Sequence, residues 1–217
     1  MALGYGTPTG GSGVPTVGSV RDRLEDLEVE RGVKNVVARC RPLLEFGLFD
    51  ETREASAFED IARNGAIVDV HGLGLEALQL AAGAFLLRRL YRQMFSWGEA
   101  DGIKLAIVLD EAHRLAKDIT LPKLMKEGRK FGIAVIVASQ GLADFHPDVV
   151  GNAGTKVVFR TNFPMSKRVA GFLRASKGVD LAANIEQLSV GEAYVHTPEM
   201  QAAARVRMYP LEQELEQ

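Results

Sequence analysis

A run of five apolar residues that ends in two carboxylates constrains the fold of this chain more than any other feature. Residues 105–109 read Leu-Ala-Ile-Val-Leu, and Asp110 and Glu111 follow directly. The run has no polar alternation, which is typical of a strand that is covered on both faces in a parallel α/β sheet. Open α/β sheets bind ligands at the carboxyl ends of their strands. The sequence therefore predicts that Asp110 and Glu111 lie at a ligand-binding edge.

Residues 57–217 alternate between predicted strands and helices. The longest helical stretch covers about residues 75–97 and is rich in Leu and Ala, and a shorter one runs from near Thr120 to just before Gly132. This alternation predicts an α/β domain with a mostly parallel sheet and helices on both faces. The predicted strands are 66–70, 104–109, 133–138, 156–160 and 192–196.

The N-terminal part has a different pattern. Residues 1–18 are dense in Gly, Pro, Ser and Thr and predict a flexible linker. Residues 19–56 predict a helical segment, in which Ser19 caps a first helix and a second covers about residues 33–46. Pro42 is expected to break or kink that second helix.

Composition narrows the functional classes. The formal net charge of the 217 residues is −2, so contact with nucleic acid has to come from a local basic patch. Cys40 is the single cysteine, which excludes an intramolecular disulfide and a Cys-based zinc cluster and makes a reducing cytoplasm the simplest compartment. The longest apolar run, residues 80–87, is too short to span a bilayer, and no secretory signal is expected at the N-terminus.

Polar residues also end the next predicted strand, because Ser139 and Gln140 follow residues 133–138. A Gln at this edge can orient a water molecule or sense a γ-phosphate, as one does in some nucleoside triphosphatases. The alternative is a capped turn. The two acids at 110 and 111 also have an alternative interpretation, since acids are favoured in the first turn of a helix.

Cations gather before that strand, in the stretch Lys126-Glu-Gly-Arg129-Lys130. A structural role is the default, because cations near the end of a helix interact favourably with its dipole. The functional hypothesis is that Arg129 is an arginine finger that reaches a γ-phosphate bound by a neighbouring subunit, with Arg160 as a weaker candidate. His113 has no histidine partner at helical spacing, so a zinc site is not favoured.

Several stretches together resemble one family. From about Ser19 to the C-terminus the chain is similar to the carboxyl-terminal half of the HerA-type ATPases, the prokaryotic hexameric DNA-pumping motors related to FtsK and to type IV secretion ATPases. The stretches that carry the resemblance are Ile67–Leu73, Leu86–Leu90, Ile107–Arg114, Glu127–Gly132, Ala138–Gln140 and Gly191–Glu192.

The resemblance implies a RecA-like fold and a site for ATP and Mg²⁺. In it, Asp110 and Glu111 match the Walker B acids, with Asp110 holding Mg²⁺ through water, and Gln140 matches the sensor. Arg129 matches the arginine that acts in trans, and Arg160 is a further candidate for nucleotide contact. The implied partners are identical subunits in a hexameric ring, double-stranded DNA and a NurA-like nuclease.

One motif of the family is absent from this sequence. The P-loop, G-x-x-x-x-G-K-S/T, cradles nucleotide phosphates, and the Gly-rich N-terminus has no Gly-Lys pair. Three explanations are open: a chain that lacks the N-terminal half, which is favoured, a P-loop on another chain, or a degenerate homologue. The chain by itself is therefore expected not to hydrolyse ATP. The functional alternatives are a non-hydrolysing interface subunit that donates Arg129, and a conjugation or type IV secretion ATPase.

The missing motif has a structural consequence. In a RecA-like sheet the P-loop strand lies between the strands predicted here at 133–138 and 156–160. Without it the sheet is incomplete, so these strands pair with each other, keep open edges or recruit a strand from another chain. Exposed apolar edges promote association, so oligomerisation or poor solubility is expected.

Overall fold

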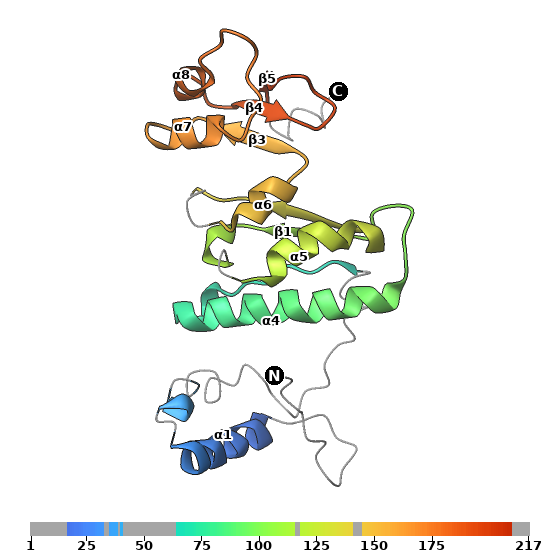
Figure 1. Cartoon of the computed structure of the whole chain (residues 1–217), viewed down its shortest axis with the longest axis vertical. Helices are drawn as coiled ribbons and strands as arrows, with labels where there is room; N and C mark the ends of the chain where they lie inside the picture. The colour runs from blue at the N-terminus through green and yellow to red at the C-terminus, as the bar shows by residue number, and fades with distance from the viewer. Residues whose placement is uncertain are drawn as a thin grey trace. The chain divides into compact units, whose positions relative to one another are not determined.

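The structure, a computed structural model, describes residues 17–32, 35–38, 40, 64–115, 118–140 and 145–209. Contacts within the chain separate it into two units, residues 1–78 and 79–217. Figure 1 shows the helices and strands of both units, coloured by their position in the sequence. No helix among these described residues is both long and apolar enough to cross a membrane.

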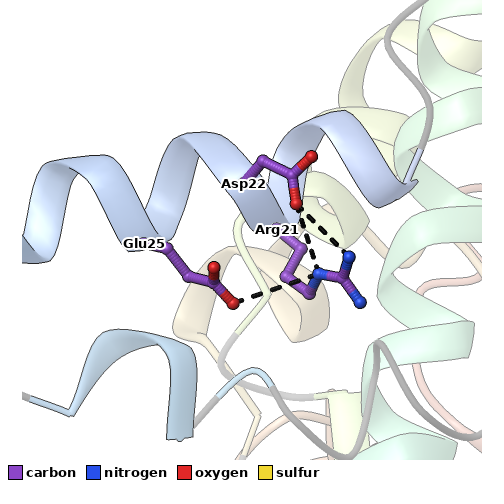
Figure 2. A network of polar contacts seen from close by, with 3 residues as sticks. All are labelled: Arg21, Asp22 and Glu25. Atoms are coloured by element: carbon purple, nitrogen blue, oxygen red, sulfur yellow. Dashed lines mark hydrogen bonds and ion pairs between the residues drawn. The ribbon is translucent and has the colours of Figure 1, made fainter.

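Helix α1 (Val17–Arg31) lies in the first unit. It begins two residues before the predicted Ser19 cap. Figure 2 shows Arg21 on this helix, 3.3 Å from Asp22 and 4.0 Å from Glu25. These side chains are more than half exposed, so the pairs contribute little to stability. Of the predicted helix at 33–46, residues 36–38 and 40 are helical. Most of the other residues of this predicted helix lie outside the described part of the chain.

The predicted strand at 66–70 is wrong. These residues have no regular secondary structure, and Ile67 is 99% exposed. Asp69 Oδ1 accepts a hydrogen bond from the backbone N–H of His71 at 2.8 Å, and the short 3₁₀ helix η1 (His71–Leu73) begins there. A strand is stable only when a neighbour satisfies its backbone groups, and no described strand pairs with this segment.

The predicted long helix is confirmed as α4 (Glu76–Met94), which continues into the 3₁₀ helix η2 (Phe95–Trp97). Leu87, Leu90 and Met94 are buried at helical spacing and form its packed stripe. Gly83 lies in the middle of α4, and a Cβ at this position would come within 3.2 Å of a Leu115 methyl. The glycine therefore lets the segment that follows the two acids pack closely on α4.

The second predicted helix is also confirmed. Helix α5 (Thr120–Glu127) continues into the 3₁₀ helix η4 (Gly128–Phe131). Leu121 and Leu124 are completely buried, and α5 packs against the strand that follows it. Asp118 lies just before the helix, and its Oδ1 satisfies one of the first free backbone donors by accepting a hydrogen bond from the Thr120 N–H at 2.7 Å.

Strands β1 (Leu105–Leu109) and β2 (Ile133–Val137) pair in parallel. This pairing confirms the α/β class with a parallel sheet. The register places Leu109 opposite Val137, so both strands end at the same edge. One face of the pair is open, with Val108 65% and Ile136 54% exposed.

The other strands form a separate antiparallel sheet that the sequence did not predict. Its order is β3 (Lys156–Phe159), β4 (Glu192–His196) and β5 (Ala204–Arg207), and β5 itself was not expected. A short loop joins β4 to β5, and such a connection suits antiparallel strands, whereas parallel ones need a long crossover. Because β2 pairs with β1 and β3 with β4, the possibility that β2 and β3 pair with each other is wrong.

The antiparallel sheet has its own hydrophobic core. Helices α7 (Met165–Ala170) and α8 (Leu181–Glu186) pack together beside it, and α6 (Pro147–Asn152) precedes it in the chain. Tyr194 of β4 is buried in this core, and Val158 of β3 packs against it. The buried residues are Val169, Leu173, Leu181, Ile185, Leu188 and Tyr194.

Candidate nucleotide site

The two acids lie where the sequence predicts, at the carboxyl end of β1. The backbone keeps this end beside β2 past the last strand residues. Ala138 N donates to Leu109 O at 2.9 Å, and Ala112 N donates to Ala138 O at 3.0 Å. These two bonds bracket Asp110 and Glu111, so the turn that carries the acids is held against the end of β2.

Glu111 has a backbone conformation that is rare for its residue type. Its φ is +48°, in the left-handed region that costs a non-glycine residue about 1–3 kcal/mol. The Glu111 N–H donates to Asp110 Oδ1 at 2.9 Å and so compensates part of this cost. Ala112, which follows, is 1% exposed and anchors the turn. The strain is localised at the residue for which the sequence predicts a catalytic role.

The structure brings Gln140 and Glu111 into direct contact. Gln140 Nε2 donates to Glu111 Oε1 at 3.0 Å, although the two residues are 29 positions apart. Glu111 is half-buried, whereas Asp110 and Gln140 are exposed. An amide that donates to a carboxylate oxygen restrains the orientation of the carboxylate.

The donor set at this edge suits Mg²⁺ better than a transition metal. Mg²⁺ in nucleotide sites is bound through one or two carboxylates, with waters and substrate phosphates completing the octahedron. Asp110 has an exposed carboxylate at the carboxyl end of β1. Within the described part of the chain no three His, Cys, Asp or Glu side chains gather into a metal cluster.

Arg129 lies at the opposite end of the parallel pair. It is on η4, just before β2 begins, while Glu111 and Gln140 lie beyond the strand ends. Five strand residues at about 3.3 Å each separate the two ends by more than 15 Å once the flanking residues are included. The structure therefore does not bring Arg129 together with Glu111 of the same chain.

The turn that carries Arg129 is held by contacts on both sides. Lys130 Nζ lies 2.8 Å from Glu99 Oε1, and Lys130 O accepts a bond from Ala100 N at 3.0 Å. Gly132 has a φ of +76°, and a Cβ there would come within 2.6 Å of Gly102 O, so this position requires glycine. The Arg129 side chain is exposed on this constrained turn.

Aromatic contacts tie the same turn to α4. The Phe131 ring lies edge-on to Phe95, and Phe95 lies edge-on to Tyr91, with both pairs of centroids 5.2 Å apart. Tyr91 Oη donates to Glu127 Oε2 at 2.9 Å. Burial raises the pKa of the Tyr91 phenol, and the nearby Glu127 carboxylate raises it further. The hydrogen bond from Lys130 to Glu99 likewise raises the pKa of the Lys130 ammonium.

The remaining candidates have different positions. Arg160 follows β3 in the antiparallel sheet, and its exposed side chain makes no hydrogen bond or ion pair with any described residue. The backbone of His113 lies in the 3₁₀ helix η3 (Ala112–Leu115), and its side chain lies outside the described part. Neither residue is joined to the Glu111–Gln140 pair by a described contact.

Sequence reasoning missed the residues that support the Arg129 turn. Tyr91 and Phe95 are four residues apart on a helix, which is the spacing of neighbouring side chains on one face, so their pairing was detectable. The contacts of Glu99, Glu127 and Lys130 carried no comparable signal, because they join separate elements.

The chain is similar in sequence to part of several known proteins. Over 96 residues the chain is 28% identical to the probable DNA double-strand break repair helicase HerA of Methanocaldococcus jannaschii, an alignment of 41% of this chain and 19% of the relative. Over 139 residues it is 28% identical to the DNA double-strand break repair helicase HerA of Sulfolobus acidocaldarius, covering 59% and 28%. No protein-family model matches the chain.

Partial matches to solved structures are also found. The plasmid coupling protein TrwB, in complex with the non-hydrolysable GTP analogue GDPNP, has a TM-score of 0.48 and 18% sequence identity, covering 57% of this chain and 35% of that one. The alignments with the two HerA relatives cover less than a third of the length of each relative. Over the matched part it is HerA-like in sequence.

Proposed function

Because the chain is HerA-like, we propose that it supplies the water-activating part of the nucleotide site in an ATP-driven translocase of double-stranded DNA. The observation that carries this proposal is the 3.0 Å hydrogen bond from Gln140 to Glu111 at the carboxyl edge of β1 and β2. Hydrolysis of a nucleoside triphosphate needs a group that positions the attacking water and a group that responds to the γ-phosphate. This pair is suited to both tasks.

Each residue at the edge has a defined role in the proposal. Asp110 holds Mg²⁺ through water, and the ion neutralises charge on the phosphates when it is bound. Glu111 accepts a hydrogen bond from the attacking water and polarises it. Gln140 orients the Glu111 carboxylate, and it exchanges this bond for one to the γ-phosphate or the water when nucleotide binds. The strained φ of Glu111 supports the assignment, since strain concentrates at functional sites.

Arg129 acts in the neighbouring subunit. Its position at the far end of β2 supports a role in trans, because it cannot reach the Glu111 edge of its own chain. A hexameric ring of identical subunits brings such an arginine to the next nucleotide site, where it stabilises transition-state charge. The HerA likeness also favours a NurA-like nuclease as a partner of the ring. Arg160 is the second candidate for contact with nucleotide.

ATP hydrolysis in the presence of duplex DNA tests this proposal. The chain is assayed alone and after it is joined to its upstream coding region or mixed with a separately encoded chain that carries G-x-x-x-x-G-K-S/T, because the motif is absent here. Glu111→Gln is expected to lower kcat by at least about 10²-fold, since it removes the group that polarises water. Arg129→Ala is expected to lower it by about 10³-fold or more.

The matched control is Lys126→Gln, which removes an exposed cation three residues before Arg129 and should leave kcat unchanged. Mixing Glu111→Gln with Arg129→Ala subunits should restore part of the activity, because some interfaces then contain both intact residues. Full activity in Glu111→Gln contradicts the proposed role of this residue. No activity in any completed wild-type assembly favours the alternative of a non-hydrolysing interface subunit.

A further inference from the structure

Helix α1 carries a narrow apolar stripe. Val20, Leu24 and Leu27 are separated by four and three residues, which is the spacing of the two core positions in a coiled-coil heptad. Arg31 occupies the next core position. A stripe limited to these positions is typical of a coiled-coil seam, and it is narrower than the face of a helix that packs into a globular core. The pattern therefore predicts that α1 pairs with another helix.

The stripe is not fully buried within the described part of the chain. Val20 is 44% exposed, and Leu24 and Leu27 are half-buried. A side chain from another helix can enter a groove on such a seam as a knob enters a hole. A groove of about 210 Å³ lies here, lined by Leu24, Leu27, Glu28, Arg31 and Val36.

Charge is segregated along the positions that flank the stripe. Arg21 and Arg23 flank its N-terminal half, whereas Glu28 and Glu30 flank its C-terminal half. In coiled coils the charges at these flanking positions select the partner helix and its orientation. A helix with the same segregation, running in the opposite direction, presents the complementary charges. The second copy of α1 is such a helix.

An antiparallel pair of α1 helices matches the charges on both flanks. When the two leucines of one copy pack opposite those of the other, Arg21 lies opposite Glu28 of the second copy, and Arg23 lies opposite Glu30. The N-terminus of each helix then lies beside the C-terminus of the other, which the helix dipoles favour. In a parallel pair only Arg23 and Glu28 come together, and the Arg31 side chains of the two copies face each other.

Contacts inside the chain leave these charges near the surface. Arg23 Nη1 lies 3.4 Å from Glu30 Oε1, and both side chains are more than half exposed. The ion pairs of Arg21 in Figure 2 are equally exposed. Such pairs contribute little to stability, so their exchange for pairs between two helices costs little. Glu28 Oε1 accepts a hydrogen bond from Val37 N at 2.7 Å, which holds the segment beside the groove against α1.

We infer that α1 pairs antiparallel with α1 of a second copy of this chain, through Val20, Leu24 and Leu27. This pairing is independent of the proposed function, because it uses no residue of the candidate nucleotide site. It is also distinct from association through the open face of β1 and β2. A helix of 15 residues is short for a coiled coil, so weak, concentration-dependent pairing is expected.

Sedimentation velocity of the full chain at increasing concentration tests the pairing. Val108→Thr/Ile136→Thr serves as the background, so that the open sheet face does not contribute. Leu24→Ala/Leu27→Ala should raise the dissociation constant by about 10²-fold or more, because each copy loses apolar surface from the seam. Alanine has the highest helix propensity, so α1 itself is retained. The control is Val29→Ala, which should change nothing, because that side chain is 86% exposed and lies off the stripe.

Charge reversal in the same background tests the flanks. Arg21→Glu/Arg23→Glu and Glu28→Arg/Glu30→Arg should each associate at least about tenfold more weakly, since like charges then face each other. A mixture of the two variants should regain the association, because every flanking pair is again opposite in charge. A mixture that associates no better than either variant alone overturns the inference. So does Leu24→Ala/Leu27→Ala that associates like the background chain, or an equal loss in Val29→Ala.

Disulfide crosslinking tests the orientation, in a chain that carries Cys40→Ser. Val20→Cys mixed with Arg31→Cys should crosslink, because these core positions lie opposite each other in the antiparallel pair. Val20→Cys by itself should not, since the two cysteines then lie about 16 Å apart along the helix axis, too far for a disulfide. Crosslinking of Val20→Cys by itself supports a parallel pair and rejects the antiparallel one. No crosslink in either sample rejects pairing through α1.

Discussion

The two sheets of the second unit differ in how completely the chain covers their faces. The antiparallel sheet of β3, β4 and β5 encloses six buried side chains with α7 and α8. The parallel pair of β1 and β2 carries the candidate nucleotide site but leaves one face open, with Val108 65% exposed. Parallel sheets are normally covered on both faces. The part that carries the candidate site is thus the part that is least complete by itself.

This difference separates two sources of stability. Residues 153–207 complete their own core, so the antiparallel sheet should depend little on other chains. The parallel pair depends on the helices packed on one side, and its open face remains available to another surface. The three predictions below test this contrast, in order of decreasing effect on the free energy of unfolding.

The largest effect is expected in the core of the antiparallel sheet. Ile185→Ala removes a side chain that is completely buried and leaves a cavity. The free energy of unfolding should fall by about 3 kcal/mol. Urea denaturation followed by circular dichroism measures this loss. Ile136→Ala is the control in the parallel pair, because that side chain is 54% exposed, and it should cost less than about 1 kcal/mol. Equal losses for the two variants contradict the contrast.

An intermediate effect is expected at Asp118, which ties α5 to α4. Burial opposes ionisation of this carboxyl group, but hydrogen bonds from Thr120 and the Arg88 guanidinium, 3.0 Å away, hold its pKa below the usual value. A lowered pKa stabilises the fold above the unfolded-state value near 3.9, and this contribution is lost as the pH falls through the folded-state pKa. Asp118→Asn should therefore cost about 1 kcal/mol at pH 7 and progressively less below pH 4.

Urea denaturation of the Asp118 variant at pH 7 and at pH 3 measures this dependence. Asp101→Asn, at an exposed bend, is the control and should be neutral at both values. A loss in Asp118→Asn that is the same at pH 7 and pH 3 shows that the negative charge does not contribute.

The smallest effect on unfolding is expected on the open face of the parallel pair. Val108 and Ile136 lie opposite each other in the register, and both are exposed. Val108→Thr/Ile136→Thr should change the free energy of unfolding by no more than about 0.5 kcal/mol, since exposed positions tolerate polar residues. The same variant should reduce self-association of the chain in sedimentation velocity, because the apolar patch is broken. A wild-type chain that stays a monodisperse monomer contradicts the predicted association.

Local sequence patterns were informative where local forces decide the structure. The helices at 76–94 and 120–127 were predicted from periodicity and punctuation, and strand β1 from an unbroken apolar run. The strand predicted at 66–70 shows the limit of this reasoning, since its composition suits a strand but no described strand pairs with it. Strand β5 was missed because a four-residue Ala-Arg-Val-Arg segment gains its strand character from pairing with β4.

The site shows the same limit. That Asp110, Glu111 and Gln140 follow apolar strands is evident from the sequence. Their contact is not, because it requires Leu109 and Val137 to lie opposite each other in the register. A shift of one residue in that pairing would move the side chains relative to one another and separate Gln140 from Glu111.

The sequence by itself determined the α/β class, most helix positions and the identity of the polar residues at the strand ends, because periodicity and strand-terminating residues are local properties. Only the tertiary structure decided which strands pair, that β3 to β5 form a separate antiparallel sheet, and that Arg129 lies at the opposite end from Glu111. These features depend on contacts between residues far apart in the chain. Their free energy comes from burial and backbone pairing, which local sequence patterns do not specify.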